Sequence, residues 1–101
     1  MISVEIFRHE RGKINGFTVR NHGKTPVCAA VSMLTINTVN SIETLTKQDF
    51  ACEYDEKGGY LRFTIDGEPE QDAAILLDAM LLGLRSAKEE YPNELEIKEQ
   101  D

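Results

Sequence analysis

Apolar and polar residues alternate in several short stretches of the chain, which is typical of strands that bury one face. The alternation is clear over residues 2–6 and 60–65, and similar patterns indicate strands at about 14–20, 49–54 and 95–97. A short polar segment that contains glycine separates 2–6 from 14–20, and another separates 49–54 from 60–65. The pattern therefore predicts five strands, four of which form two hairpins.

Two longer segments repeat their apolar residues at spacings of three and four, as an amphipathic helix does. The first runs from about Val27 to Leu45, and Thr25 and Pro26 suit its N-cap and its first helical position. Its apolar face is expected to contain Val27, Ala30, Val31, Leu34, Ile42 and Leu45. The second helix is expected over 70–90, with an apolar stripe of Ala73, Leu76, Leu77, Met80, Leu81, Leu84 and Ala87.

The resulting order, ββαββαβ, predicts an α+β fold in which an antiparallel or mixed sheet is covered by two helices. A chain of 101 residues has room for one hydrophobic core, so we expect a single domain over residues 1–101. No apolar run approaches the roughly 18 residues of a membrane span. The N-terminus also lacks the basic and then apolar layout of a signal peptide. We therefore expect a cytoplasmic protein without a membrane partner.

The formal net charge of −7 at pH 7 argues against a nucleic-acid-binding protein, because phosphate contacts need clustered Lys and Arg. An acidic surface instead attracts a basic partner. The two cysteines, Cys28 and Cys52, are too few for a disulfide framework and would stay reduced in a reducing compartment. Cys52 alternates with aromatic residues in a predicted strand, so we expect it to pack in the core.

The segment from His22 to Ser32 is where the sequence looks chemically specialised. His22 is expected just after the second strand, and Cys28 in the first turn of the first helix. A helix N-terminus favours a thiolate over a thiol. The five residues between them span at most about 20 Å, so a turn can bring the imidazole to the sulfur. Such a pair would supply the nucleophile and the base of an acyl-transfer reaction.

Neighbouring groups could support that reaction. Unpaired N–H groups of Cys28 and Ala29 would be candidates for an oxyanion hole, and Ser32, one turn further along, could orient the sulfur or the substrate. A third, orienting residue is not identifiable, and four are possible: Asn21, Asn40, Asp49 and Asp66. On spacing alone, an inert core cysteine and a solvated histidine are the more common interpretation of these two residues.

The sequence Cys28-Ala29-Ala30-Val31-Ser32, preceded by His22-Gly23 at the end of a strand, resembles the ribosomal-processing cysteine proteases. The similarity covers nearly the whole chain. The opening hairpin, Asn37 and Asn40 of the first helix, the turn Gly58-Gly59-Tyr60-Leu61 and the Leu-rich second helix follow the family's order.

The resemblance implies an α+β homodimer that cleaves the N-terminal extension of a large-subunit ribosomal protein, without a cofactor or metal. It assigns the nucleophile to Cys28, the base to His22 and the helix serine to Ser32. Family substrates are cut after an aromatic residue in a short apolar motif, just ahead of a basic ribosomal sequence. The exposed-looking Ile75 and Leu82 agree with a dimer interface.

Two features depart from the family pattern. Asn21 stands where the family commonly has glycine before the histidine. The segment between His22 and Cys28 is also shorter than the Gly-rich, Asp-containing loop of many members. A short segment that contains Pro26 is expected to move less as a lid over the site.

Two other functions remain open on the sequence. The first is a non-catalytic acidic interaction protein that binds a ribosomal or other basic partner through a groove, in which case Cys28 would be buried and slow to react. The second is a metal-binding module with His22 and Cys28 as ligands, although two further ligands at suitable spacing are missing.

Overall fold

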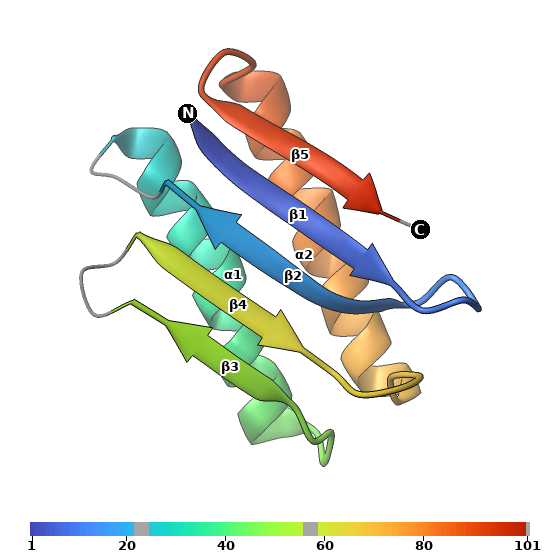
Figure 1. The fold of residues 1–101 in the computed structure, drawn as a ribbon. Helices are drawn as coiled ribbons and strands as arrows, with labels where there is room; N and C mark the ends of the chain where they lie inside the picture. The colour runs from blue at the N-terminus through green and yellow to red at the C-terminus, as the bar shows by residue number, and fades with distance from the viewer. Residues whose placement is uncertain (22–24, 56–58, 101) are drawn as a thin grey trace.

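The computed structural model describes residues 1–21, 25–55 and 59–100, and these contain five strands and two helices (Figure 1). The predicted order ββαββαβ and the α+β class are confirmed. In chain order the elements are β1 (Ile2–Arg8), β2 (Ile14–Arg20), α1 (Pro26–Leu45), β3 (Ala51–Tyr54), β4 (Tyr60–Thr64), α2 (Gln71–Glu90) and β5 (Leu95–Gln100).

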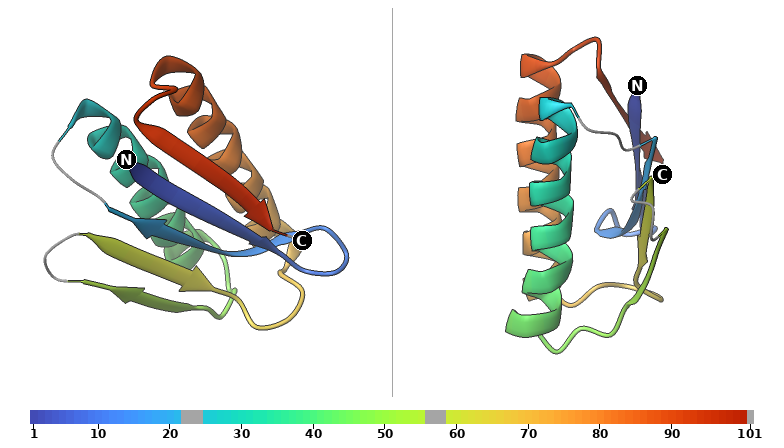
Figure 2. Two further views of the ribbon diagram at one scale, coloured as in Figure 1. Left: turned by 45° about the horizontal axis from the view of Figure 1, so that its top comes forward. Right: turned by 90° about the vertical axis from the view of Figure 1, so that its left-hand side faces the viewer.

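The strands form one sheet in the order β3-β4-β2-β1-β5. The pairs β1–β2, β2–β4 and β3–β4 are antiparallel, whereas β1 and β5 are parallel, so the sheet is mixed. Both helices lie on one face of it, side by side, and the molecule therefore has two layers (Figure 2). No helix in the described ranges is long and apolar enough to cross a membrane.

The core lies between the sheet and the helices. The alternating side chains Ile2, Val4 and Ile6 of β1 are buried, as the period-2 pattern predicts. In the centre, the rings of Phe17 on β2 and Phe63 on β4 stack with their centroids 5.3 Å apart. The helices cover these strands with the buried residues Val27, Val31, Ile42, Ala73, Leu77, Met80, Leu81 and Leu84. The predicted apolar stripe of α2 is thus confirmed.

Two sequence-based expectations about the element ends are wrong. Leu45 was expected on the apolar face of α1, but it is the last residue of that helix and its side chain is 72% exposed. The last strand was expected to stop at Ile97, yet β5 continues to Gln100, which pairs with Phe7 of β1. A strand edge offers backbone hydrogen bonds whatever the side chains are, so polarity alone did not end β5.

Side chains also hold the end of β5 in place. The guanidinium groups of Arg8 and Arg85 contact the two carboxylate oxygens of Glu99 at 2.9 and 2.7 Å. These hydrogen bonds, first from Arg8 and then from Arg85, lower the pKa of Glu99. Because all three side chains are partly exposed to solvent, the ion pairs add little stability and mainly fix the geometry.

The contact between β2 and β4 gives a test of the fold. A Cβ atom at Gly16 would lie 2.8 Å from the carbonyl oxygen of Phe63, which is held in the sheet, whereas one at Gly59 would meet nothing within 4 Å. We expect Gly16→Ala to lower the free energy of unfolding by roughly 1–3 kcal/mol. Gly59→Ala is the matched control and should be neutral. Urea unfolding of both variants measures this, and equal midpoints would contradict the register.

Candidate active site

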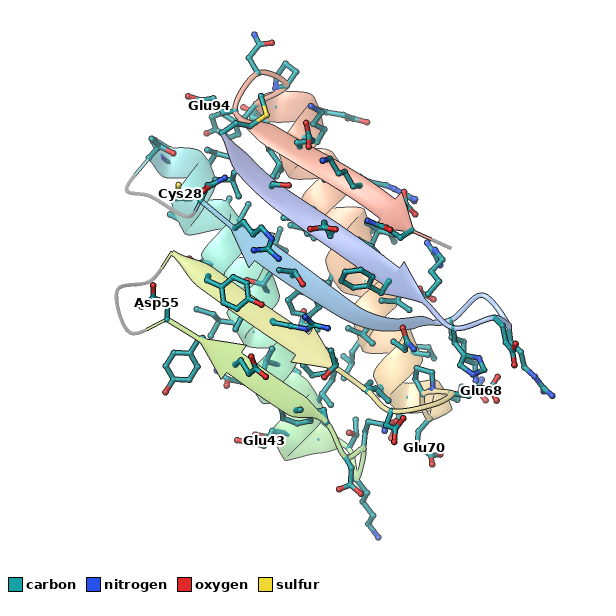
Figure 3. All side chains as sticks on the ribbon, in the orientation of Figure 1. Cys28, Glu43, Asp55, Glu68, Glu70 and Glu94 are labelled. Carbon is teal, nitrogen blue, oxygen red and sulfur yellow. The ribbon has the colours of Figure 1, made fainter. Side chains whose placement is uncertain are left out.

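Cys28 lies in the first turn of α1, as predicted, at the end of the sheet where β2 stops (Figure 3). The chain leaves β2 at Arg20 and enters α1 at Pro26. His22, the predicted base, lies outside the described residues, as does Lys24. The pairing of the imidazole with the sulfur therefore stays a prediction.

The side chain of Cys28 is buried, with 3% of its surface exposed. On this point the structure agrees with the non-catalytic alternative, in which the cysteine is covered. The sulfur nevertheless has a polar contact, because the hydroxyl of Thr25 donates a hydrogen bond to Sγ over 3.2 Å. An inert core cysteine is surrounded by apolar groups, so this contact sets Cys28 apart. The residue pattern indicated Thr25 only as a helix cap and not as a residue of the site.

The expectation of unpaired N–H groups at the start of α1 is wrong for Cys28 and Ala29. Both groups donate to the carbonyl oxygen of Thr25, over 3.0 and 3.2 Å respectively. The cause is local: Thr25 ends the extended segment before the helix, and its carbonyl closes the first turn. A developing oxyanion can use these two donors only by replacing the Thr25 carbonyl.

An apolar groove of about 410 Å³ lies between α1 and the β3–β4 hairpin. Its helical wall consists of Ser32, Ile36, Val39 and Asn40. The opposite wall is formed mainly by Val19, Cys52, Tyr54, Asp55, Tyr60 and Leu61. Ser32 follows Cys28 by one helical turn, so the groove begins next to the predicted nucleophile. Its apolar walls suit a peptide segment with apolar side chains.

Cys52 was expected in the core, but it is only half-buried and lines the groove. Desolvation raises the pKa of its thiol, and the carboxylates of Glu43 and then Glu53 raise that pKa further. A raised pKa keeps Cys52 as a neutral thiol at neutral pH, which is unfavourable for a nucleophile. Of the two cysteines, the environment therefore favours Cys28 for covalent chemistry.

The candidates for a third, orienting residue lie in different parts of the molecule. Asp49 and Asp66 border a different hollow, beyond the far end of α1. The helix rises roughly 25 Å between Cys28 and its last residue, so neither aspartate can orient a group at the sulfur. Asn40 lines the groove that begins beside Cys28, but its place on the same helix is roughly 18 Å further along, so it does not orient a group at the sulfur either.

Asp55 is an acidic residue of the groove that the sequence analysis missed. It follows β3 directly and lies toward the same end of the sheet as Cys28 (Figure 3). The two hairpins contain the signal for this placement. Because β2 and β3 each run antiparallel to β4, they run in the same direction and end at the same side of the sheet. Asn21 and Asp55, which follow β2 and β3, therefore lie at the side of the sheet where α1 begins.

The residues that the structure describes contain no group of three His, Cys, Asp or Glu side chains placed to hold a metal ion. His22, one of the two ligands in the metal-binding interpretation, is not among those residues. The other two predicted site residues lie in different surroundings on α1. Ala29 is exposed at the start of α1, and Ser32 is half-buried in the groove wall.

Asn21, which departs from the family pattern, has a positive φ of 62°. Glycine adopts this left-handed region freely, and asparagine is among the side chains that tolerate it. The backbone requirement at this position is thus met by an asparagine. The chain can leave β2 toward His22 through the conformation that a glycine would favour.

This geometry predicts the effect of two substitutions at Asn21. Asn21→Gly should leave the free energy of unfolding nearly unchanged, whereas Asn21→Val should lower it by about 1–2 kcal/mol because a β-branched residue is strained at positive φ. The side chain of Asn21 is exposed, so lost packing does not complicate the comparison. Equal urea midpoints for the two variants would rule out this conformation.

Comparison with known proteins identifies relatives along almost the whole chain. The sequence model of a family described as cysteine protease Prp matches residues 1–96. The ribosomal processing cysteine protease Prp of Staphylococcus aureus (strain Mu50) is 28% identical over 103 residues, which cover 96% of this chain and 97% of the relative. The protein of the same name from Bacillus subtilis (strain 168) is 29% identical over 80 residues, covering 75% of this chain and 71% of the relative.

Solved structures agree with the sequence relatives. The essential ribosomal processing protease Prp of S. aureus in complex with a substrate peptide has a TM-score of 0.90 and 26% identity, over 99% of this chain and 100% of that one. The same protease with a covalently linked product peptide has a TM-score of 0.93 and 28% identity, with the same coverage. The fold described above is therefore shared with a protease that binds peptides.

Proposed function

The chain belongs to the cysteine protease Prp family, and we propose that it removes the N-terminal extension of a large-subunit ribosomal protein in the cytoplasm. One observation carries this proposal: Cys28 lies at the start of α1, one helical turn before Ser32, which is the first residue of this helix to line the apolar groove. The S. aureus protease that shares the fold has been solved with a substrate peptide and with a covalently linked product peptide. A cysteine beside a groove is the arrangement that such chemistry needs.

The proposed reaction is acyl transfer to the sulfur of Cys28. The thiolate attacks the carbonyl carbon of the scissile peptide bond, and the carbon–nitrogen bond breaks as protonated His22 donates its proton to the leaving amine. Water then attacks the thioester as neutral His22 takes one of its protons; the carbon–sulfur bond breaks, the carboxylic acid product leaves, and the Cys28 thiolate and protonated His22 are restored. This sequence of steps needs no metal. The N–H groups of Cys28 and Ala29 would stabilise the oxyanion once the Thr25 carbonyl has moved away.

The groove supports an apolar substrate segment. Its walls contain Ile36, Val39 and Leu61, and Tyr54 and Tyr60 lie at the side of the hairpin. An aromatic or aliphatic side chain that enters such a groove is removed from water, which contributes about 25 cal/mol for each Å² of apolar surface buried. The ribosomal sequence beyond the cleaved bond would be basic, and a protein with a net charge of −7 attracts it electrostatically.

Cleavage of a peptide tests the proposal. A synthetic peptide that copies the ribosomal protein's N-terminal extension should be cut once by the wild-type protein, after the aromatic residue of its apolar motif. Cys28→Ala should abolish the cut, because no other group would supply the acyl acceptor. Cys52→Ala is the matched control for the loss of a thiol: it should still cut the same bond, with any change confined to KM, because Cys52 lines the groove and does not supply the acyl acceptor. Mass spectrometry of the products gives both the position and the extent of the reaction.

The same experiment examines the non-catalytic alternative. Under that interpretation the wild-type protein would bind the peptide without cutting it, and Cys28→Ala would bind equally well. Titration of the fluorescently labelled peptide measures binding separately from cleavage. Binding without cleavage by the wild type would replace the protease proposal with the interaction-protein interpretation.

We also propose that the protein acts as a homodimer. Met33, Ile75 and Leu82 are 73%, 60% and 65% exposed, and they lie on the helices, which cover only one side of the sheet. The helices approach closely where Gly83 faces the side chain of Leu34, so Met33 and Leu82 belong to the same region of the helix layer. A second copy of the chain would remove these apolar side chains from water.

The dimer proposal predicts a change in molecular mass. Leu82→Glu places a charge in the proposed interface, and we expect it to shift the protein from dimer to monomer in size-exclusion chromatography with light scattering. Leu45→Glu is the control, because Leu45 is 72% exposed at the far end of α1. A wild-type protein that elutes as a monomer at micromolar concentration would refute the proposal.

A further inference from the structure

Thr25 occupies the N-cap position of α1, but its side chain does not cap the helix. A threonine at this position normally accepts a hydrogen bond from an N–H group of the first helical turn. Here the N–H of Cys28 is taken by the main-chain carbonyl of Thr25 instead. The hydroxyl donates to Sγ of Cys28 over 3.2 Å. The helix start is thus closed by the backbone, and the side chain contacts the sulfur.

From this geometry we propose that Thr25 is a positioning residue for Cys28: its hydroxyl orients Sγ and stabilises the negative charge that the sulfur carries as a nucleophile. The inference rests on the proposed role of Cys28. It concerns a group that neither the residue pattern nor the comparisons assign.

The physical basis is the strength of a hydrogen bond to an anion. A donor that bonds to an ionised group favours that form, and such bonds are about twice as strong as those between neutral groups. The threonine side chain is well suited to the task, because branching at Cβ restricts its rotamers. In the described conformation its position relative to the sulfur is fixed as well, before any opening of the turn, since the Thr25 carbonyl accepts hydrogen bonds from both Cys28 and Ala29.

A purely structural role would have a different signature. The side chain of Thr25 is exposed and makes no capping bond, so removal of its hydroxyl takes no cap from the helix. The stability of the fold should therefore depend little on that hydroxyl. The ionisation of Cys28 should depend on it strongly.

The test compares Thr25→Val, which removes the hydroxyl at nearly constant shape, with Thr25→Ser, which keeps it. The rate of Cys28 alkylation by iodoacetamide is followed as a function of pH by mass spectrometry of the peptide that contains Cys28, which separates it from Cys52. We expect Thr25→Val to raise the inflection of the alkylation rate against pH by about one pH unit. At a pH below the inflection, the variant would then have about tenfold less Cys28 thiolate than the wild type. Thr25→Ser should keep the wild-type profile.

Peptide cleavage gives the second readout. At a pH below the inflection, kcat for Thr25→Val should fall by about tenfold, with KM nearly unchanged, because the hydroxyl acts on the sulfur and not on the substrate. Thr25→Ala also removes the hydroxyl and should behave like Thr25→Val, which guards against a folding defect specific to valine. His22 and Lys24 are present in every variant, so a difference between two profiles comes from the substituted side chain.

Thr38→Val is the matched control on the same helix. The hydroxyl of Thr38 donates to the carbonyl oxygen of Leu34 over 2.7 Å, far from the sulfur. We expect its alkylation profile and its kcat to equal those of the wild type. A wild-type alkylation inflection in both Thr25→Val and Thr25→Ala would overturn the role of Thr25.

The failure of this inference is distinguishable from the failure of the proposed function. The alkylation profile measures Cys28 directly and does not require catalysis. If Cys28→Ala still cleaves the peptide, Cys28 is not the nucleophile and the proposed function fails. If Cys28→Ala is inactive and the hydroxyl-free variants keep the wild-type profile, only the role of Thr25 fails.

Discussion

Burial of one face of α1 against the sheet is the constraint on which the site depends. Val27, Val31 and Ile42 are almost completely covered, and together they fix both the rotation of the helix and its position along the sheet. Because the helix starts at Pro26, the same rotation directs the side chain of Cys28 inward and leaves Ala29 outside. The packing that stabilises the domain therefore also determines where the predicted nucleophile lies.

The topology of the sheet provides the second wall of the site. Since β2 and β3 run in the same direction on either side of β4, Asn21 and Asp55, which follow these strands, lie at the side of the sheet where α1 begins. Asn21 reaches this place through a positive φ, and Asp55 through the end of the β3–β4 hairpin. The Asp49 and Asp66 alternatives lie at the other end, which leaves Asn40 and Asp55 as the polar groups of the groove wall beyond Ser32.

The periodicity of the sequence predicted the elements well, because each helix and strand buries a face whose spacing is visible along the chain. The structure begins α1 at Pro26 and α2 at Gln71, each within one residue of expectation. Features that depend on distant partners were beyond this reasoning. The length of β5 follows from its pairing with β1, and the occupied N–H group of Cys28 follows from the carbonyl of Thr25. Neither interaction leaves a mark in the residue pattern.

In the described conformation the first turn of α1 is closed, and this is incompatible with two requirements of catalysis. A peptide carbonyl must come within bonding distance of a sulfur that is 3% exposed, and the oxyanion needs N–H groups that now donate to Thr25. Both obstacles lie in the same turn, so one local rearrangement around Thr25 would remove them together. A peptide bound in the groove is adjacent to that turn and stands to gain the released hydrogen bonds. Its binding energy can therefore shift the turn toward an open state, so that the nucleophile is exposed more of the time when a substrate is bound.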